Sequence, residues 1–428
     1  MLNRKIQPAV KAIDRITIPV PDRRTMKNGA SLNIIDAGDQ DVVRLDVLIR
    51  GGQWDQEQPL QAMFSNRMLR EGTRRFTSSG IAEKLDYYGS WMELSVAMEY
   101  SFLTLYSLNK YFEETLDVVE SMLKEPMFPE KELTVVAEIN KQQFLVNNEK
   151  ADTIARKQLN RSLFGTSHPC GQFAIADDYD KLNSSLLRTF YRQFYSSANC
   201  SVYISGKVTG RILTLVEKAL GVNTWGDALP MAGKNDFPIE TTREKRVFVD
   251  RPDVLQSSVK LGALSLDRNH PDFHKFKMAV TLFGGYFGSR LMSNIREDKG
   301  YTYGIVSGLV SYPKTGVLVI STETANEYVE NVIREIYHEI DVLHNELVPE
   351  DELSMVRNYM LGEMCRNYEG PFSLSDAWIY IECGKLDDSF YRQSFEAIKT
   401  ITPSEIRDLS QKYLRKESLI EVIAGKKM

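Results

Sequence analysis

Hydrophobic and polar residues follow two different periods along the chain. Alternation of the two kinds predicts strands at residues 42–52, 99–108, 257–264 and 315–324. A recurrence of apolar residues every three to four positions predicts helices at residues 115–125, 135–145, 329–343 and 355–364. Strands often follow one another without a helical crossover, so we expect an α+β fold with mostly antiparallel sheets and helices packed on them.

The pattern of the first half of the chain recurs in the second half. The segment Pro-Glu-Lys-Glu-Leu at 129–133 returns as Pro-Glu-Asp-Glu-Leu at 349–353, and each copy follows an amphipathic helix. At a helix end and on an alternating strand, Phe194, Ile204 and Gly206 precede Tyr413, Ile423 and Gly425 by 219 positions. Two matches in the same order indicate duplication of a domain of roughly 200 residues.

The two predicted domains cover residues 1–225 and 246–428. Between them, residues 226–245 combine Gly, Pro, Asn and Asp with a loss of periodicity, which is typical of a linker.

Composition narrows the classes of function. Lys and Arg number 53 and Asp and Glu 58, which gives a net charge of −5 and excludes a protein that mainly binds nucleic acid. No segment approaches the roughly 20 apolar residues of a membrane helix, so we expect no membrane partner. The N-terminal residues do not resemble a signal peptide, and the four cysteines form no C-x-x-C pair. We therefore expect a cytoplasmic chain with reduced thiols.

A family resemblance begins at residues 59–73, PLQAMFSNRMLREGT, where proline precedes a predicted helix and Gly72 follows it. This segment resembles the first helix of the pitrilysin/insulinase-type zinc peptidases, which carries the motif H-x-x-E-H. The motif positions fall on Met63, Asn66 and Arg67. Similar segments lie at 26–35, 163–171, 194–206 and, most extensively, 270–305. By the same resemblance, the third zinc ligand of the family falls on Glu138.

The residues at these positions do not suit zinc. A catalytic zinc takes imidazole or carboxylate ligands at about 2.0–2.2 Å, with a carboxylate acting on the bound water. Met63 offers a thioether, Asn66 a weakly basic amide and Arg67 a permanent cation. Two unit charges about 4 Å apart interact by ~4 kcal/mol at an effective dielectric near 20, so a guanidinium opposes a dication by roughly twice that. We expect no metal and no catalytic residue in this chain.

The histidines offer no replacement site. The chain has five, and none precedes His168. His270 and His274 have helical spacing, but no Glu or Cys nearby completes a ligand set. We interpret them as structural or surface residues.

One hypothesis concerns the positions that bind zinc in the active members of the family. Because arginine presents a fork that suits a carboxylate, we expect Arg67 to pair with Glu138. The alternative is that Glu138 is an ordinary residue of a helix surface.

The second half keeps a pair of residues that the resemblance marks as functional. In the family, an Arg and a Tyr seven positions apart bind the substrate backbone and help to polarise its scissile carbonyl, and these positions fall on Arg296 and Tyr303. An Arg and a Tyr hydroxyl can donate hydrogen bonds to a developing oxyanion. Tyr301 replaces Tyr303 if the register slips. A structural alternative pairs Arg296 with Glu297 on the surface.

Together these features imply a non-catalytic, substrate-binding subunit of a heterodimeric zinc metallopeptidase. The resemblance implies a homologous partner subunit that carries H-x-x-E-H and the zinc, and a peptide substrate held in an enclosed chamber by β-augmentation. The alternative is a structural or binding protein of the same fold, a homodimer or larger homo-oligomer with no role in proteolysis.

Overall fold

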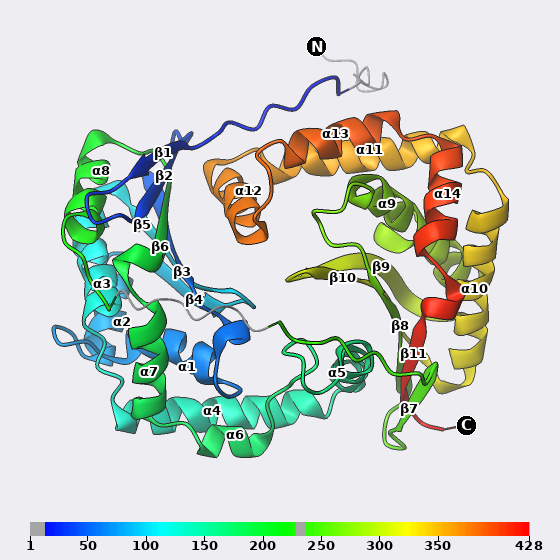
Figure 1. Ribbon diagram of the computed structural model, residues 1–428, viewed down its shortest axis with the longest axis horizontal. Coiled ribbons are helices and arrows are strands. Elements are labelled where there is room, and N and C mark those ends of the chain that lie inside the picture. The colour runs from blue at the N-terminus through cyan, green and yellow to red at the C-terminus, as the bar shows by residue number, and fades with distance from the viewer. Residues whose placement is uncertain (1–12, 228–235, 428) are drawn as a thin grey trace, which may run out of the picture.

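The computed structural model describes residues 13–227 and 236–427. Two sheets, one from each half of the chain, are covered by helices (Figure 1). The first sheet contains β1 (Asp22–Thr25), β2 (Ser31–Asp36), β3 (Val42–Arg50), β4 (Trp91–Val96), β5 (Tyr100–Leu108) and β6 (Cys200–Gly206). The second contains β7 (Arg246–Asp250), β8 (Gln256–Ser265), β9 (Thr302–Tyr312), β10 (Thr315–Ala325) and β11 (Ile420–Gly425).

The helices also fall into two groups. The first half contributes α1 (Gln61–Arg67), α2 (Ser78–Tyr87), α3 (Phe112–Lys124), α4 (Glu130–Asn148), α5 (Ala151–Phe164), α6 (Ala176–Asp180), α7 (Ser184–Phe194) and α8 (Gly210–Val216). The second half contributes α9 (Phe273–Val280), α10 (Val329–Asn345), α11 (Glu350–Asn367), α12 (Pro371–Gly384), α13 (Phe390–Thr400) and α14 (Pro403–Tyr413). The predicted strands and helices are confirmed, with ends that shift by a few residues.

Five strands of the first sheet share the topology of the second, and β1 is an additional edge strand. The first has the order β1-β2-β6-β3-β5-β4 and the second β7-β11-β8-β10-β9. In each, one parallel pair, β2 with β6 or β7 with β11, adjoins a series of antiparallel pairs. The repeated positions also match in register, because Leu45 pairs with Ile204 and Val259 pairs with Ile423. The α+β fold with two similar domains, predicted from the repeats, is confirmed.

Burial follows the position of each strand in its sheet. Seven consecutive residues of β3 are buried, because this strand lies between β5 and β6 and is covered on both faces. On β4, exposed and half-buried residues alternate, as expected for a strand at the edge of a sheet.

The two halves exchange one helix each. α5 of the first half packs on β8 and β11 of the second, while α12 of the second half packs on β6 and β2 of the first (Figure 1). Gly262 of β8 allows the close approach of α5, since a Cβ at that position would lie 2.9 Å from Leu159 Cδ2. The exchange ties the halves into one body.

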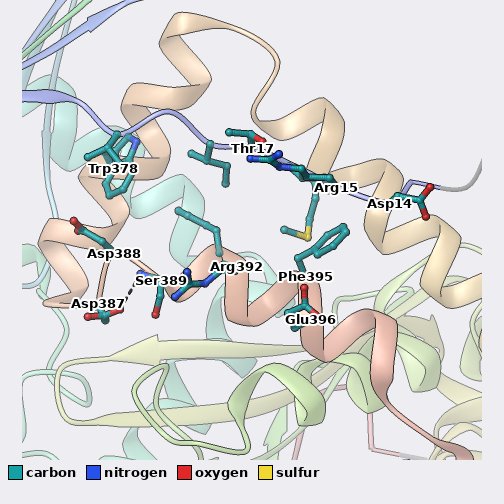
Figure 2. Close-up of a pocket in the computed structure, with 15 residues that line it drawn as sticks. Asp14, Arg15, Thr17, Trp378, Asp387, Asp388, Ser389, Arg392, Phe395 and Glu396 are labelled. Carbon is teal, nitrogen blue, oxygen red and sulfur yellow. Dashed lines mark hydrogen bonds between the residues drawn. The ribbon is translucent and has the colours of Figure 1, made fainter.

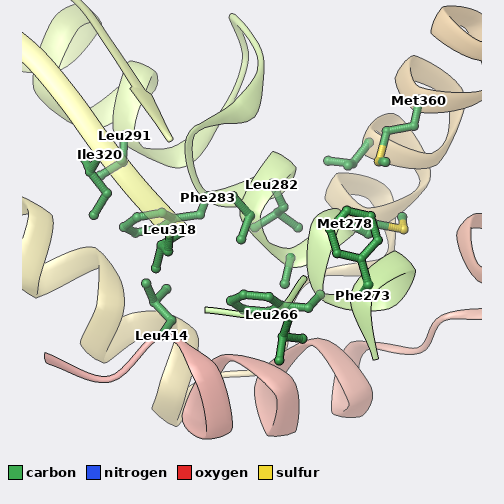
Figure 3. Packing of buried hydrophobic residues seen from close by; sticks show 14 of the residues in the cluster. Leu266, Phe273, Met278, Leu282, Phe283, Leu291, Leu318, Ile320, Met360 and Leu414 are labelled. Carbon is green, nitrogen blue, oxygen red and sulfur yellow. The ribbon is translucent and has the colours of Figure 1, made fainter. Parts of the chain in front are cut away.

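The largest apolar core lies in the second half. Phe283 and Leu282, which follow α9, are fully buried with Leu318 of β10, and Leu414 closes the cluster after α14 (Figure 3). Full burial of such a side chain contributes about 1.5–3 kcal/mol. This core holds the second sheet against α9, α10 and α14, and so fixes the strands that carry the candidate site.

Two connecting segments pack on the halves, the predicted linker on residues of the first half and the N-terminal segment on helices of the second. Residues 228–235 of the predicted linker lie outside the described residues. After them, the Phe237 ring contacts Trp54 and His168, and Glu240 N donates to Phe164 O at 3.2 Å. Near the N-terminus, residues 14–20 cross α11–α13 and form one wall of a cavity of about 660 Å³ (Figure 2).

Two further expectations concern membranes and thiols. Across residues 13–227 and 236–427, no helix has the length and apolar character needed to cross a membrane. All four cysteines carry free thiols.

Candidate functional site

Asn66 is a structural residue of the first half. The side chain is 2% exposed, and Nδ2 donates to the backbone carbonyl of Phe102 at 3.2 Å and to the Tyr195 hydroxyl at 3.0 Å. These bonds join α1 to β5 and to the segment after α7. Because a buried amide must be hydrogen-bonded, the amide at this position is fully engaged in holding the fold.

Its two neighbours in the motif have different surroundings. Met63 is half-buried and packs against the first-half core. Arg67, in the last turn of α1, is exposed. Burial raises the pKa of the Tyr179 phenol, and the positive charge of Arg67 lowers this pKa in part.

The predicted ion pair between Arg67 and Glu138 is wrong. No ion pair joins these two residues, both of which lie in the described part of the chain, and Glu138 instead accepts a hydrogen bond from Gln142 Nε2 at 2.7 Å. α4 buries Leu133 and Ala137, which leaves Glu138 on the exposed side of the helix. Glu138 is therefore an ordinary residue of a helix surface, which was the alternative to the ion pair.

Zinc does not fit these residues. The amide of Asn66 already donates to two oxygens, Arg67 is a cation, and Glu138 is bound to a side chain of its own helix. Within residues 13–227 and 236–427, no cluster of three or more His, Cys, Asp or Glu residues could hold a metal ion.

The histidines have structural contacts. His168 Nδ1 accepts from the backbone N–H of Cys170 at 3.1 Å, and His344 Nε2 lies 3.1 Å from the carbonyls of Ser410 and Leu414. His274 is buried against Phe390, and burial lowers its pKa to about 4. Burial favours the neutral form of His168 and His274 by lowering the pKa of each, and both side chains serve packing.

In the second half the structure brings Arg296 and Tyr303 together. The guanidinium carbon of Arg296 lies 5.5 Å from the centre of the Tyr303 ring and 4.6 Å from that of Phe287. Its Nη1 also donates to Glu297 Oε1 at 2.8 Å, so the surface ion pair is present as well. The two rings and the carboxylate hold the guanidinium in one orientation, so Arg296 is a positioned side chain and not a mobile one.

Exposure distinguishes the two candidate tyrosines. Tyr303 is 90% exposed, whereas the ring of Tyr301 stacks on Tyr328 at 4.9 Å and its hydroxyl accepts from Asn331 Nδ2 at 3.2 Å. Tyr301 therefore has a packing role. Tyr303 is the tyrosine of this loop that a ligand can reach.

The local backbone explains how the pair forms. Arg296 lies on the helical turn Met292–Asp298, and Gly300, with φ of 65°, reverses the chain into β9. A left-handed residue at this reversal favours glycine, so the spacing of seven positions becomes a short distance in space. β9 forms one edge of its sheet, with β10 as its partner.

Comparisons with known proteins show the family of the chain. The family model described as "Insulinase (Peptidase family M16)" matches residues 36–167, and the model "Peptidase M16 inactive domain" matches residues 181–360. These matches cover both halves of the chain. The chain belongs to peptidase family M16. With Met63, Asn66 and Arg67 at the motif positions, it is a non-catalytic member of the family.

Similar proteins are known from several bacteria. This M16 chain is 22% identical over 308 residues to "Uncharacterized zinc protease YmxG" of Bacillus subtilis, which covers 72% of this chain and 74% of the relative. It is 23% identical over 389 residues to "Non-peptidase homolog YmxG" of Helicobacter pylori, at 88% and 87% coverage. A crystal structure titled as a peptidase M16 inactive domain from Pseudomonas fluorescens has a TM-score of 0.84 at 22% identity, covering 95% of this chain and 98% of the other.

Two features of this M16 chain were missed in the sequence. Phe287, which is 68% exposed and lies 4.6 Å from the Arg296 guanidinium carbon, was not recognised as a neighbour of the pair. Arg156 and Lys157 of α5 line a cavity of about 590 Å³ beside Met63. The sequence shows an aromatic residue near Arg296 and two adjacent cations, but the surroundings that give these residues a role depend on tertiary contacts.

Proposed function

We propose that this chain is the substrate-binding, non-catalytic subunit of a heterodimeric zinc peptidase whose homologous partner carries an intact H-x-x-E-H motif and the zinc. The observation that carries the proposal is the pairing of Arg296 with an exposed Tyr303 beside the edge strand β9. The first half, by contrast, uses its motif positions for packing and backbone hydrogen bonds. A chain that lost all contact with substrate has no evident use for the exposed pair.

The pair has the hydrogen-bonding capacity that the role needs. Arg296 has five N–H donors, of which Glu297 engages one nitrogen at 2.8 Å, and the Tyr303 hydroxyl lies in solvent. Both can donate to a peptide carbonyl, and hydrogen-bond donors fixed before the substrate binds stabilise negative charge that develops on oxygen.

The adjacent strand gives a way to hold an extended peptide. β9 is paired with β10 on one side and forms an edge of the sheet on the other. Its outer backbone N–H and C=O groups can pair with a peptide strand, as in β-augmentation. Substrate on this edge would run past Tyr303, which lies on β9 itself.

An exposed apolar stripe supports the presence of a partner chain. On α4, Val135, Ile139 and Val146 are 53%, 62% and 61% exposed and fall on one face of the helix. Contiguous exposed apolar residues mark interaction surfaces. We assign this face to the partner subunit, and we place the complex in the cytoplasm, where free thiols such as the four of this chain persist.

The test is assembly with the H-x-x-E-H paralogue encoded in the same genome. The two chains are purified separately and together, and their masses and their cleavage of a fluorogenic unfolded peptide are measured. We expect a 1:1 complex that cleaves the peptide, with little activity from either chain alone. A paralogue that is fully active alone, or a chain that forms only homo-oligomers, would overturn the proposal.

A further inference from the structure

A cavity of about 590 Å³ opens beside Met63 in the first half of the chain. Its walls come from the start of α1, from α4 and α5, from the segment after His168, and from Tyr312 at the end of β9. The volume lies in the range of roughly 300–1,000 Å³ that is typical of ligand sites. Tyr179, whose pKa is lowered in part by the charge of Arg67, also lines the cavity.

The charged side chains that line this cavity are all cations. Arg156 and Lys157 line it, and no Asp or Glu does. Neither cation makes an ion pair in the described part of the chain; Lys157 Nζ donates to Asn148 Oδ1 at 2.6 Å and lies 4.7 Å from the centre of the Phe144 ring. Burial lowers the pKa of Lys157, and the charges of Arg156 and Arg161 lower it further. An anion in the cavity would relieve this repulsion.

A second cavity shows that such an imbalance is not general in this chain. The cavity beneath the N-terminal segment has a similar volume of about 660 Å³, but both acids and arginines line it. Asp387, Asp388 and Arg392 lie together there in Figure 2. Both signs of charge line that cavity, whereas the charged residues that line the cavity beside Met63 are cations alone.

The remaining polar groups beside Met63 suit a peptide backbone. Eight Asn and Gln side chains line the cavity. A carboxamide both donates and accepts hydrogen bonds, as does a peptide group, so such a lining can satisfy a chain of peptide groups. Asn148 and Asn160 are held in place by bonds to Lys157 and to the Tyr312 hydroxyl.

We propose that this cavity binds a carboxylate of an unfolded peptide, with Arg156 and Lys157 holding the carboxylate and the carboxamides holding the adjoining backbone. The carboxylate is either the C-terminus of the peptide or an acidic side chain. The place where active relatives bind a metal cation thus borders, in this chain, a site for an anion.

The surroundings favour an extended ligand over a small free anion. A further cavity of about 510 Å³ adjoins the first and shares Met98 and Tyr312 with it. A peptide anchored at Arg156 can continue along this path between the halves. The inference rests on the proposed function only in taking a peptide as the ligand, since the site itself belongs to this chain and needs no partner.

The experiment measures peptide binding to the isolated full chain by fluorescence anisotropy. Four labelled peptides share one unfolded neutral sequence and carry Glu or Gln at one central position and a free or amidated C-terminus. The chain is compared with R156Q/K157Q and with the control R211Q/K218Q, which removes the same charge from an exposed helix surface. Thermal unfolding confirms that each variant is folded.

We expect at least tenfold weaker binding to R156Q/K157Q, binding to the control within twofold of the wild type, and a loss of affinity in moderate salt. Preference for the free C-terminus identifies a terminal site, and preference for Glu identifies a side-chain site. Equal binding of all four peptides, or equal binding by R156Q/K157Q and the wild type, overturns the proposal. Because no partner is present, this outcome leaves the heterodimer to be tested separately.

Discussion

Lys260 of β8 donates a hydrogen bond to Asp152 of α5 across the boundary between the two halves, with 2.6 Å between Nζ and Oδ1. The matched strand pairs place Asp46 of β3 at the corresponding position in the first sheet. There Arg44 bonds Asp46 at 2.7 Å and Asp376 of α12 at 2.5 Å. Each exchanged helix is therefore tied by charge to the sheet that it covers.

Removing Asp152 should cost more than removing Lys260. The Lys260 side chain is 6% exposed, while that of Asp152 is 49% exposed. Asp152→Ala leaves a buried ammonium with the Ser321 hydroxyl, 2.7 Å away, as its remaining partner, so we expect a loss of about 3 kcal/mol. Lys260→Met leaves a carboxylate that water can reach, and we expect a loss below about 1 kcal/mol. Urea unfolding measures both, and a larger loss for Lys260→Met would contradict this reading.

In the Arg44 network, removing the cation of the strand should cost more stability than removing Asp376 of the exchanged helix. Arg44→Met leaves Asp46, 4% exposed, without its cation, and we expect a loss of about 3–5 kcal/mol. Asp376 is 67% exposed and its removal leaves the Arg44–Asp46 bond in place, so Asp376→Asn should cost below about 1 kcal/mol. Equal losses in urea unfolding would show that the network does not act as the geometry indicates.

Asn66→Asp should destabilise the fold although the two side chains have the same shape. The carboxylate cannot donate to the Phe102 carbonyl or the Tyr195 hydroxyl, and it places a charge at a position that is 2% exposed. We expect a loss of about 2–3 kcal/mol in the free energy of unfolding. The control is Asn223→Asp at an exposed site, which should stay within about 0.5 kcal/mol. Wild-type stability of Asn66→Asp would show that the amide is not needed as a donor.

His274 should make stability depend on pH. Burial, and then the charge of Lys277, lowers its pKa from 6.5 to about 4 in the folded chain. Between these values the unfolded chain binds the proton and the folded chain does not, so stability is lost as the pH falls from about 6.5 towards 4. From pH 7 to pH 5 this residue should account for a loss of about 2 kcal/mol.

The variant His274→Phe isolates that contribution. Its free energy of unfolding should fall by about 2 kcal/mol less than that of the wild type between pH 7 and pH 5. His338→Phe, at an exposed histidine, should follow the wild type. Parallel curves for all three proteins would mean that His274 titrates normally in the folded state.

The repeats and the strand and helix pattern were accessible from the sequence because each depends on local periodicity or on short spacing, whereas the Arg296–Tyr303 pair was implied by the family resemblance. Pro129 and Pro349 do precede α4 and α11, and Tyr303 does reach Arg296 across one chain reversal. Local rules of this kind act within a few residues of each other.

The features that were not predicted depend on tertiary contacts. Glu138 was paired with Arg67 from the family resemblance and from the fit of a guanidinium to a carboxylate, but the rotation of α4, set by Leu133 and Ala137, directs Glu138 to solvent. The exchange of α5 and α12 cannot be read from periodicity, because a helix stripe does not specify which sheet it covers. Arg156 and Lys157 line the cavity beside Met63 only because α5 lies against α4.

The most direct test of the account is the kcat/KM for peptide cleavage by the complex with the H-x-x-E-H partner, with substitutions in this chain only. Arg296→Ala and Tyr303→Phe should each lower kcat/KM by at least about tenfold, because each removes a donor to the substrate. The matched controls are Arg407→Ala, at an arginine that also pairs with its neighbouring acid, and Tyr87→Phe, at a tyrosine that is 82% exposed; both should stay within twofold. If the complex is active and all four variants cleave as the wild type does, this chain does not contact the substrate through Arg296 and Tyr303, and the account is wrong.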